Sequence, residues 1–199
     1  PVGEQLANEI SKAGGNASFE HTDVTSTVQL ENLFERHMHR CSRLDVLFNN
    51  ASWEGPGCSV VETTEQDLDR VLATNFKSVF LACKIAAPIM TVARRGSIIN
   101  TSAGSAREGL AWPNLGAYIG AKGAVISFTR ALAVELSPLG IRVNSLNPGI
   151  VNTPMLQTFA AKQPDKEAFW AGLATLQFLK RVAEPHELAQ AALFLASDE

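Results

Sequence analysis

Short apolar runs alternate with helical patterns along the whole chain, and this alternation restricts the fold most strongly. Leu44–Asn49 is nearly all apolar, which is typical of a strand in a parallel sheet covered on both faces. Further strands are predicted at Ala17–Val24, at Ser97–Ser102 and from Ile141 to the turn at Pro148-Gly149. The repeated strand-then-helix order predicts an α/β fold, with a doubly wound parallel sheet in a three-layer α/β/α arrangement.

Helices are predicted between and beyond these strands from apolar spacing and capping residues. Val2, Leu6 and Ile10 are spaced as in a helix that begins at Pro1. The other predicted helices are Thr27 to about Arg40, a long helix from about Thr64 with Thr63 or Thr64 as N-cap, Leu115–Ser137, and one that starts at Glu184-Pro185. We therefore expect residues 1–199 to form a single domain.

Composition excludes several classes of protein. The net charge of −3 and the absence of a Lys/Arg-rich run argue against a nucleic-acid partner. The three cysteines share no close spacing, so neither a metal site nor a disulfide framework is predicted. The best apolar run, Ser78–Pro88, is interrupted by Lys84, so we expect no membrane span. Without a signal-peptide pattern, a cytoplasmic location is expected.

The only tyrosine, Tyr118, stands four residues before Lys122. On a helix this spacing places a phenol and an ammonium on one face. A nearby cation favours the phenolate and lowers its pKa from about 10, which makes the tyrosine a usable general acid/base. The alternative is an incidental surface pair, because Tyr and Lys occur at this spacing by chance.

Small and amide side chains follow three of the predicted strands. These strand ends are Asn49–Ser52, Asn100–Ser105 and Asn147–Gly149. Ligands of doubly wound sheets bind at the carboxyl ends of the strands, so the three segments predict one site. A turn-forming role is the alternative for any single Asn or Gly among them.

These residues resemble the short-chain dehydrogenase/reductase family, over essentially the whole chain. Asp23-Val24 matches the family's adenine-contacting acidic segment, and Asn49-Asn50-Ala51 matches its Asn-Asn-Ala-Gly turn, with Ser52 in place of glycine. Asn75 matches the helix asparagine that holds a proton-relay water. Tyr118 and Lys122 match the catalytic pair. Pro148-Gly149, with Val151 and Thr153, matches the segment that holds the nicotinamide end.

The resemblance implies a Rossmann-like fold and hydride transfer between NAD or NADP and an alcohol or ketone. Tyr118 is expected to move the proton on the substrate oxygen, Lys122 to lower the pKa of Tyr118 and hold the nicotinamide ribose, and Asn75 to link Lys122 to solvent through water. The residues implied to contact the cofactor are Asp23, Val24, Asn50, Ala51, Ser52, Tyr118, Lys122, Pro148, Gly149, Val151 and Thr153.

The catalytic serine departs from the family pattern. Asn-x-Ser-Ser would place it at Ala103, with Ser102 one residue early and Ser105 two residues late. Side chains alternate faces along a strand, so Ser102 would point the wrong way. Counting back from Tyr118 reaches Ser105, which we favour, and loss of the serine role is a third alternative.

The family's glycine-rich strand–helix turn does not stand in this sequence. That turn, the strand whose end discriminates NAD from NADP, and the last strand of the family are expected to lie outside residues 1–199. The sequence is therefore expected to be a fragment with a sheet incomplete at both ends. An open apolar sheet edge at Leu44–Phe48 should follow.

The segment of about residues 153–180 is expected to form a substrate lid. Its apolar and aromatic residues, with Trp53 and Trp112 near the mouth, favour an apolar or ring-shaped alcohol or ketone. The small residues of the helices Thr64–Ala93 and Leu115–Ser137 suggest a homodimer or homotetramer, although burial within the protomer explains them equally well. The alternative function is a catalytically inactive cofactor-binding, regulatory or oligomer subunit.

Overall fold

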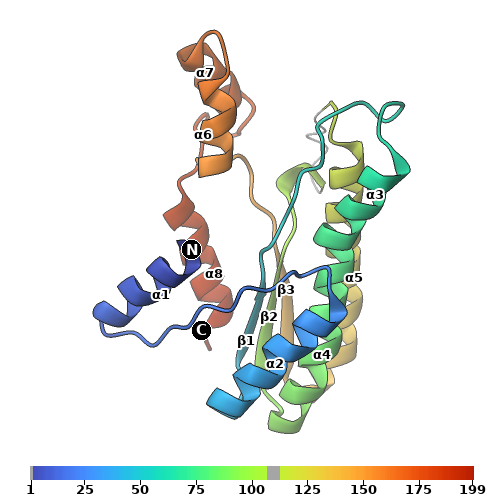
Figure 1. The fold of residues 1–199 in the computed structure, drawn as a ribbon, viewed down its shortest axis with the longest axis vertical. Coiled ribbons are helices and arrows are strands. Elements are labelled where there is room, and N and C mark those ends of the chain that lie inside the picture. The colour runs from blue at the N-terminus through green and yellow to red at the C-terminus, as the bar shows by residue number, and fades with distance from the viewer. Residues whose placement is uncertain (1, 107–112) are drawn as a thin grey trace.

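The computed structural model describes residues 2–106 and 113–199, apart from the side chains of Met155 and Phe159. Three parallel strands form the sheet in the order β1 (Val46–Asn49), β2 (Gly96–Thr101) and β3 (Ile141–Leu146). Helices lie on both sides of this sheet (Figure 1). The predicted three-layer α/β/α arrangement is therefore present.

The helices follow the predicted order. They are α1 (Val2–Lys12), α2 (Thr27–Cys41), α3 (Glu65–Leu72), the π-helical turn η1 (Ala73–Lys77), α4 (Ser78–Ala93), the 3₁₀ turn η2 (Gly104–Ala106), α5 (Gly116–Leu136), the 3₁₀ turn η3 (Ser137–Leu139), α6 (Pro154–Ala161), α7 (Lys166–Thr175) and α8 (Pro185–Ala196). Thr64 is the N-cap of α3, since its Oγ1 accepts from the backbone N of Asp67 at 3.1 Å. A capping box between Glu184 and Glu187 starts α8.

The main core lies between the sheet and the helix pair α4 and α5. β2 is the central strand, so its isoleucines, Ile98 and Ile99, are almost completely buried. Cys83 and Met90 of α4 and Val125 of α5 are also fully buried. The apolar character of β2 follows directly from its place between two strands and two helix layers.

The helix Glu65–Ala93, which joins α3, η1 and α4, is long and apolar enough by length and composition to cross a membrane. This corrects the expectation from the sequence that the chain has no run of that kind. One such helix is weak evidence for a membrane span, because core helices have the same composition. Its Ala82, Cys83 and Ala86 are buried in the protomer, as in a core helix.

The segment Ala17–Val24 is not a strand in the structure, which corrects the prediction. It crosses in extended form from α1 to α2 without a neighbouring strand. The Phe19 ring lies against Gly3 of α1, so closely that a Cβ at Gly3 would overlap it. An apolar alternation is only a local signal, whereas a strand needs a partner for its backbone.

β1 is an edge strand of the described sheet. Its outward residues Val46 and Phe48 are 37% and 44% exposed. The predicted open edge at Leu44–Phe48 is confirmed in this structure.

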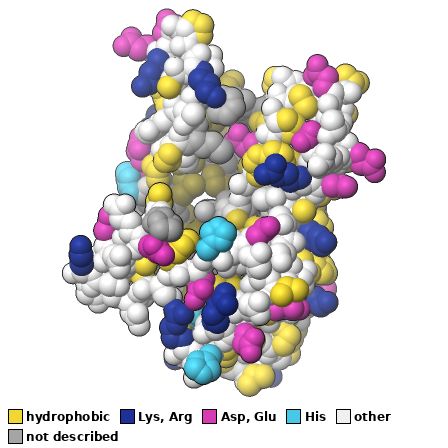
Figure 2. Space-filling view, in the orientation of Figure 1, with side chains coloured by type: hydrophobic (Ala, Val, Ile, Leu, Met, Phe, Trp, Pro, Cys, Tyr) yellow, Lys and Arg dark blue, Asp and Glu magenta, His cyan; other side chains and the backbone are white. Residues whose placement is uncertain are grey.

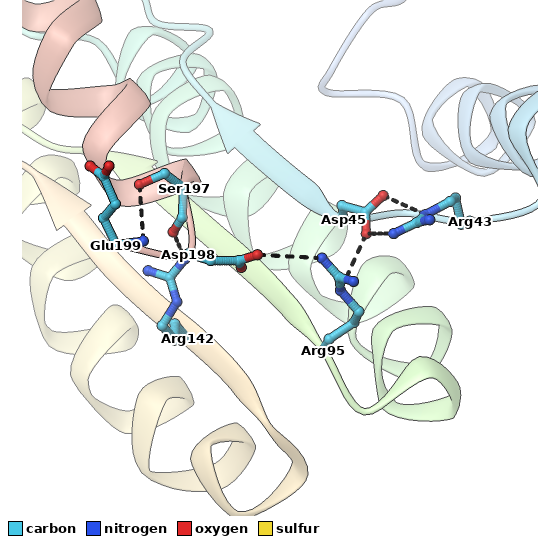
Figure 3. A network of polar contacts seen from close by, with 7 residues as sticks. All are labelled: Arg43, Asp45, Arg95, Arg142, Ser197, Asp198 and Glu199. Carbon is cyan, nitrogen blue, oxygen red and sulfur yellow. Dashed lines mark hydrogen bonds and ion pairs between the residues drawn. The ribbon is translucent and has the colours of Figure 1, made fainter.

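Polar contacts join the C-terminal end of α8 to the edge of the sheet where the strands begin, opposite the edge that carries the candidate site (Figure 3). Arg142 of β3 donates to the backbone oxygens of Leu195 at 2.9 Å and Ser197 at 2.7 Å. Arg95 lies within ion-pair distance of Asp45 and Asp198, at 3.6 and 3.8 Å. These contacts hold the last helix against β2 and β3.

Candidate active site

Helix α5 carries the tyrosine–lysine pair next to the carboxyl end of β2. The Lys122 Nζ lies 5.8 Å from the centroid of the Tyr118 ring. The two side chains therefore share one face of the helix, as their spacing predicts. The phenol is half-buried, while the lysine is 1% exposed.

Lys122 is anchored at the end of β2. Its Nζ donates to the backbone oxygen of Thr101 at 2.8 Å. Burial lowers the pKa of this ammonium to about 8, because a low-dielectric surrounding disfavours the charged form. At neutral pH the site therefore holds a buried cation that is closer to losing its proton than an ordinary lysine.

The pKa of Tyr118 differs from the prediction. Burial raises it above its usual value, the Glu54 carboxylate raises it further, and a hydrogen bond with Ser52 lowers it. The Lys122 ammonium is not among the groups that lower it. The reason is geometric, since the ammonium is directed to the Thr101 carbonyl and not to the phenol oxygen.

The two candidate serines occupy different environments. The Ser102 hydroxyl donates to the backbone oxygen of Lys122 at 2.6 Å, and the residue is 3% exposed. Its hydroxyl fastens α5 to β2 and does not face a ligand. Ala103, where the family pattern has its serine, is also buried.

Ser105 lies in the turn η2, directly after the end of β2, and is half-buried. Within the described residues its hydroxyl has no hydrogen-bond partner. It is therefore the serine whose hydroxyl remains available to a ligand. The following loop, including Trp112 at residues 107–112, lies outside the described residues.

Asn75 lies in the π-helical turn η1 and is fully buried. Its Oδ1 accepts from the Ser52 Oγ at 2.8 Å and from the Trp53 backbone N at 3.1 Å. Its Nδ2 donates to the backbone oxygens of Trp53 and Val71 at 2.7 and 2.9 Å. Asn75 thus holds the loop after β1 onto the helix, and the expected water-mediated link from Asn75 to Lys122 stays a prediction. π-turns of this kind are frequent at functional sites.

Amide side chains join the ends of β1 and β2. Asn49 Nδ2 donates to Asn100 Oδ1 at 2.8 Å, and Asn100 Nδ2 donates to the Thr129 hydroxyl at 3.0 Å. The Thr101 hydroxyl donates to Asn50 Oδ1 at 3.1 Å. Two of the three strand ends that the sequence grouped into one site, those of β1 and β2, are therefore joined by hydrogen bonds.

Ala51 and Ser52 continue this loop and are exposed. Asp23 and Val24 belong to a turn instead of a strand end. Asp23 Oδ1 accepts from the backbone N and the hydroxyl of Thr25, at 2.9 and 2.7 Å, and these bonds lower the pKa of the carboxyl. The Asp23 side chain is exposed, and its predicted contact with adenine stays a prediction.

The segment after β3 packs against η2. The backbone N of Gly104 donates to the Pro148 oxygen at 2.7 Å, and a Cβ at Gly104 would lie 3.0 Å from that oxygen. A Cβ at Gly149 would lie closer still to its neighbour and would overlap the Gln177 side chain. Val151 forms a bridge with Ala183. Thr153 lies at the start of α6, where its hydroxyl accepts from the Leu156 N at 3.3 Å.

Helices α6 and α7 form an arm that stands away from α3, α4 and α5 (Figure 1). Both helices belong to the segment of residues 153–180 that is expected to form the substrate lid. Leu173 is buried, whereas Phe178 and Leu179 are 82% and 78% exposed. Figure 2 shows a hollow beside the arm with apolar side chains at its base.

Two contributors to the site were not predicted from the sequence. The Thr101 carbonyl holds the Lys122 ammonium, and a backbone oxygen leaves no sequence signal. Glu54 lines a small pocket together with Tyr118, Gly116 and Thr63. The sequence did contain a signal for Glu54, since it is a charged residue close to the small residues Ala51, Ser52 and Gly55.

No cluster of three His, Cys, Asp or Glu side chains suited to a metal occurs in residues 2–106 and 113–199. Cys41 is exposed, Cys58 is half-buried and Cys83 is buried, and all three are free thiols. Burial raises the pKa of the Cys83 thiol to about 12, so it is a packing residue of the core.

A parallel α/β/α sheet with a tyrosine–lysine pair at its carboxyl edge defines the class of an NAD(P)-dependent oxidoreductase. A family model described as enoyl-(acyl carrier protein) reductase matches residues 2–199. Cyclopentanol dehydrogenase of Comamonas sp. (strain NCIMB 9872) is 38% identical over 198 residues, which are 100% of this chain and 76% of that protein. The chain belongs to the short-chain dehydrogenase/reductase family.

Other relatives agree with this assignment. Momilactone A synthase of Oryza sativa subsp. japonica is 40% identical over 197 residues, which are 97% of this chain and 70% of that protein. The solved structure of NAD+-bound xylitol dehydrogenase has a TM-score of 0.90 at 25% identity and covers 99% of this chain and 79% of that one. The expected Rossmann-like fold, NAD(P) cofactor and alcohol or ketone chemistry are confirmed at this level.

The residues present fit the nicotinamide end of such a cofactor. Asn147 Oδ1, directly before Pro148, is buried and has no hydrogen-bond partner among residues 2–106 and 113–199, and a buried polar atom of this kind calls for a ligand or water. The glycines on either side of the Gly104–Pro148 contact leave room for close backbone approach. No glycine-rich strand–helix turn stands in the sequence, so no residue here is assigned to the pyrophosphate.

Proposed function

We propose that Tyr118 is the proton donor and acceptor of a dehydrogenase that acts on a small ring-shaped alcohol or the corresponding ketone. The observation that carries this proposal is the Tyr118–Lys122 face of α5, with an almost completely buried ammonium beside a half-buried phenol. NAD(P), when bound, supplies or accepts the hydride at the substrate carbon. The chain's own side chains handle the substrate oxygen and its proton.

Tyr118 takes the hydroxyl proton during alcohol oxidation and returns it to the carbonyl oxygen during reduction. Ser105 donates a hydrogen bond to the same oxygen, since its hydroxyl is not used within the described protein. Lys122 supplies a positive charge next to Tyr118, and its hydrogen bond to the Thr101 carbonyl holds the ammonium in place. Asn75 positions the loop that carries Ser52, since its Oδ1 accepts from the Ser52 hydroxyl at 2.8 Å.

Three observations support a ring-shaped or apolar substrate. The hollow beside the α6–α7 arm has apolar side chains at its base (Figure 2). Phe169 and Trp170 of α7 stack edge to face, with ring centroids 5.9 Å apart. The similar Comamonas enzyme is named for cyclopentanol.

The test is NAD(P)H oxidation by the purified protein against a panel of cyclic ketones. We expect turnover with cyclopentanone, and a loss of about 10²- to 10⁴-fold in kcat/KM for Tyr118→Phe. The cofactor affinity of Tyr118→Phe, measured by fluorescence titration, should be nearly that of the wild type. Cofactor binding without turnover of any ketone would favour a cofactor-binding or regulatory relative instead.

We further propose that the protein is a cytoplasmic homodimer or homotetramer without a nucleic-acid or membrane partner. The oligomer would pack through α4 and α5. Phe80 of α4 and Val134 of α5 are 45% and 77% exposed, and a Cβ added at Gly120 or Gly123 of α5 would have no neighbour within 4 Å in the described part of the chain. Sedimentation of the purified protein tests the state directly.

A further inference from the structure

Gln177 stands where the chain leaves the α6–α7 arm and returns toward the sheet. Its side-chain Oε1 accepts a hydrogen bond from the backbone N of Ile150 at 3.1 Å, across 27 residues of sequence. Ile150 directly follows the Pro148-Gly149 turn at the end of β3. The bond therefore joins the C-terminal end of the arm to the turn from which the arm departs.

This contact fixes the orientation of the Gln177 amide. A backbone N–H can only donate, so the atom that faces Ile150 is the amide oxygen. The oxygen also lies against Gly149, where an added Cβ would overlap it. A side chain at residue 149 would therefore displace the amide, and glycine leaves the room that this close approach needs.

The main chain around Gln177 is held on both sides. Its backbone N donates to the Ala174 oxygen at 3.1 Å, and its backbone oxygen accepts from the Lys180 N at 3.0 Å. The Lys180 Nζ donates to the Thr175 oxygen at 2.9 Å and so closes the same turn. The half-buried Gln177 side chain thus reaches Ile150 from a fixed base.

The Pro148-Gly149 turn borders the candidate active site. The backbone N of Gly104 donates to the Pro148 oxygen at 2.7 Å. Gly104 begins η2, which follows the strand end that anchors the Lys122 ammonium. The turn also belongs to the segment that is predicted to hold the nicotinamide end of the cofactor. A shift of this turn would therefore move the nicotinamide relative to Tyr118.

Two backbone bonds hold the following segment independently of the amide. Ala183 N donates to the Ile150 oxygen at 3.0 Å, and Asn152 N donates to the Ala183 oxygen at 2.8 Å. Neither bond uses the Ile150 N–H or touches Gly149, which are the groups that Gln177 engages. Removal of the amide should loosen the turn while these two bonds keep the arm attached.

We propose that Gln177 is a positioning residue for the nicotinamide end of the cofactor. Its amide oxygen holds the Ile150 N–H and so keeps the Pro148-Gly149 turn in one geometry. This inference rests on the dehydrogenase function proposed above. Because Gln177 acts through the turn, its loss should weaken binding of the nicotinamide half and leave the adenosine diphosphate half bound as before.

The binding test compares NAD+ with ADP-ribose, and NADP+ with 2′-phospho-ADP-ribose, because the second member of each pair lacks only the nicotinamide. Gln177→Met keeps the length of the side chain and removes the amide. We expect it to bind the better of the two dinucleotides about threefold to tenfold more weakly than the wild type does, as one lost hydrogen bond predicts. The matching ADP-ribose should bind both proteins equally in calorimetric titrations.

The matched control is Gln157→Met, which removes another exposed amide of the arm, one that donates to the Asn152 side chain at 3.0 Å. This variant should bind the dinucleotide as the wild type does. Equal dinucleotide binding by Gln177→Met and the wild type would overturn the inference. An equal loss for the dinucleotide and its ADP-ribose would also overturn it, because a general structural effect does not distinguish the two ligands.

Two further variants test the contact itself. Gln177→Glu retains an oxygen that accepts from Ile150 N, so its dinucleotide affinity should stay within about twofold of the wild type. Gly149 does not have a positive φ, so alanine fits the backbone there and conflicts with the Gln177 amide. Gly149→Ala should lower the melting temperature, and Gly149→Ala with Gln177→Ala should restore it without restoring affinity. Recovery of both properties would show that the turn needs no amide, against the proposal.

Kinetics separates this inference from the dehydrogenase function. Ketone turnover combined with dinucleotide affinity that does not depend on Gln177 would reject the inference alone. Gln177-dependent dinucleotide binding with no turnover of any ketone or alcohol would leave the inference standing and reject the dehydrogenase function.

Discussion

Lys122 carries a charge in a buried position, where among the described residues the Thr101 carbonyl accepts a hydrogen bond from its ammonium. Such a group makes stability depend on pH, because its pKa differs between the folded and unfolded chains. Below about 8 the lysine is charged in both states and the full burial penalty applies. Above the pKa that it has in the unfolded chain, the lysine is neutral in both states and the penalty vanishes.

Stability should therefore rise between pH 8 and pH 10.5 through Lys122, by about 3 kcal/mol at most. In Lys122→Met this part of the pH dependence should disappear. Urea unfolding at pH 7.5, 9 and 10.5 measures the difference between the two proteins. Parallel pH curves for wild type and variant would show that the lysine is not buried as described.

The two serines at the end of β2 should give opposite phenotypes. Ser102→Ala removes a buried hydrogen bond to the Lys122 carbonyl and should cost about 1–3 kcal/mol of unfolding free energy. Ser105→Ala removes no hydrogen bond among the described residues, so it should leave the melting temperature nearly unchanged and lower kcat/KM.

Calorimetry and steady-state kinetics on both variants separate the roles. If Ser102→Ala reduced turnover more than stability, Ser102 and not Ser105 would be the serine on the substrate oxygen. If neither variant lost turnover, the family's serine role would be absent from this chain.

Helix α5 contains two glycines, Gly120 and Gly123, that face open space in the protomer. Glycine inside an exposed helix costs about 1 kcal/mol relative to alanine. Both positions lack a positive φ, so alanine fits the backbone. Their retention in a 21-residue helix is explained if a second helix packs closely there.

Gly120→Ala and Gly123→Ala should thus stabilise an isolated protomer by about 1 kcal/mol each. In an oligomer packed through α5 the same changes should weaken association. Sedimentation velocity over a concentration series, combined with thermal unfolding, distinguishes these results. Unchanged association would exclude α5 from the interface.

At the scale of elements, the sequence predicts best what local pattern determines. The strand β2, the cap at Thr64 and the start of α8 at Pro185 were all predictable, because periodicity and capping chemistry are local. The false strand at Ala17–Val24 shows the limit, since pairing depends on a neighbour that local sequence cannot supply.

In the candidate site, too, some features follow from local sequence and others depend on the tertiary structure. The spacing of Tyr118 and Lys122 places them on one face regardless of context. The direction of the Lys122 ammonium, and with it the pKa of Tyr118, depends on where the Thr101 carbonyl comes to lie. The π-turn at Asn75 is equally hidden, because the helical pattern continues through it.

For the whole molecule, the contacts at the base of the sheet predict which arginine stabilises the fold. Arg142 donates to two backbone oxygens at the end of α8, whereas Arg95 pairs with Asp45 and the 94% exposed Asp198 (Figure 3). Charge-assisted bonds to fixed carbonyls contribute more than solvent-screened surface pairs.

Arg142→Gln should therefore lower the free energy of unfolding by about 1–2 kcal/mol. The matched variant Arg95→Gln should change it by about 0.5 kcal/mol or less. Denaturant titrations at low and high salt provide the comparison, and only the small Arg95 effect should fade with salt. Equal effects of the two substitutions would show that α8 is not held through its carbonyls.

The amide pair at the ends of β1 and β2 has a consequence for folding fidelity. Asn49 and Asn100 are register partners in the ladder, and their side chains are also bonded at 2.8 Å. A slip of β1 by one residue would set Phe48 opposite the buried Asn100 and turn the apolar set of β1 to the wrong face. The misaligned sheet would lose the Asn49 bond to Asn100 Oδ1 and leave that oxygen only the weaker Cys83 thiol donor, so the amide pair favours the native strand alignment even without a ligand.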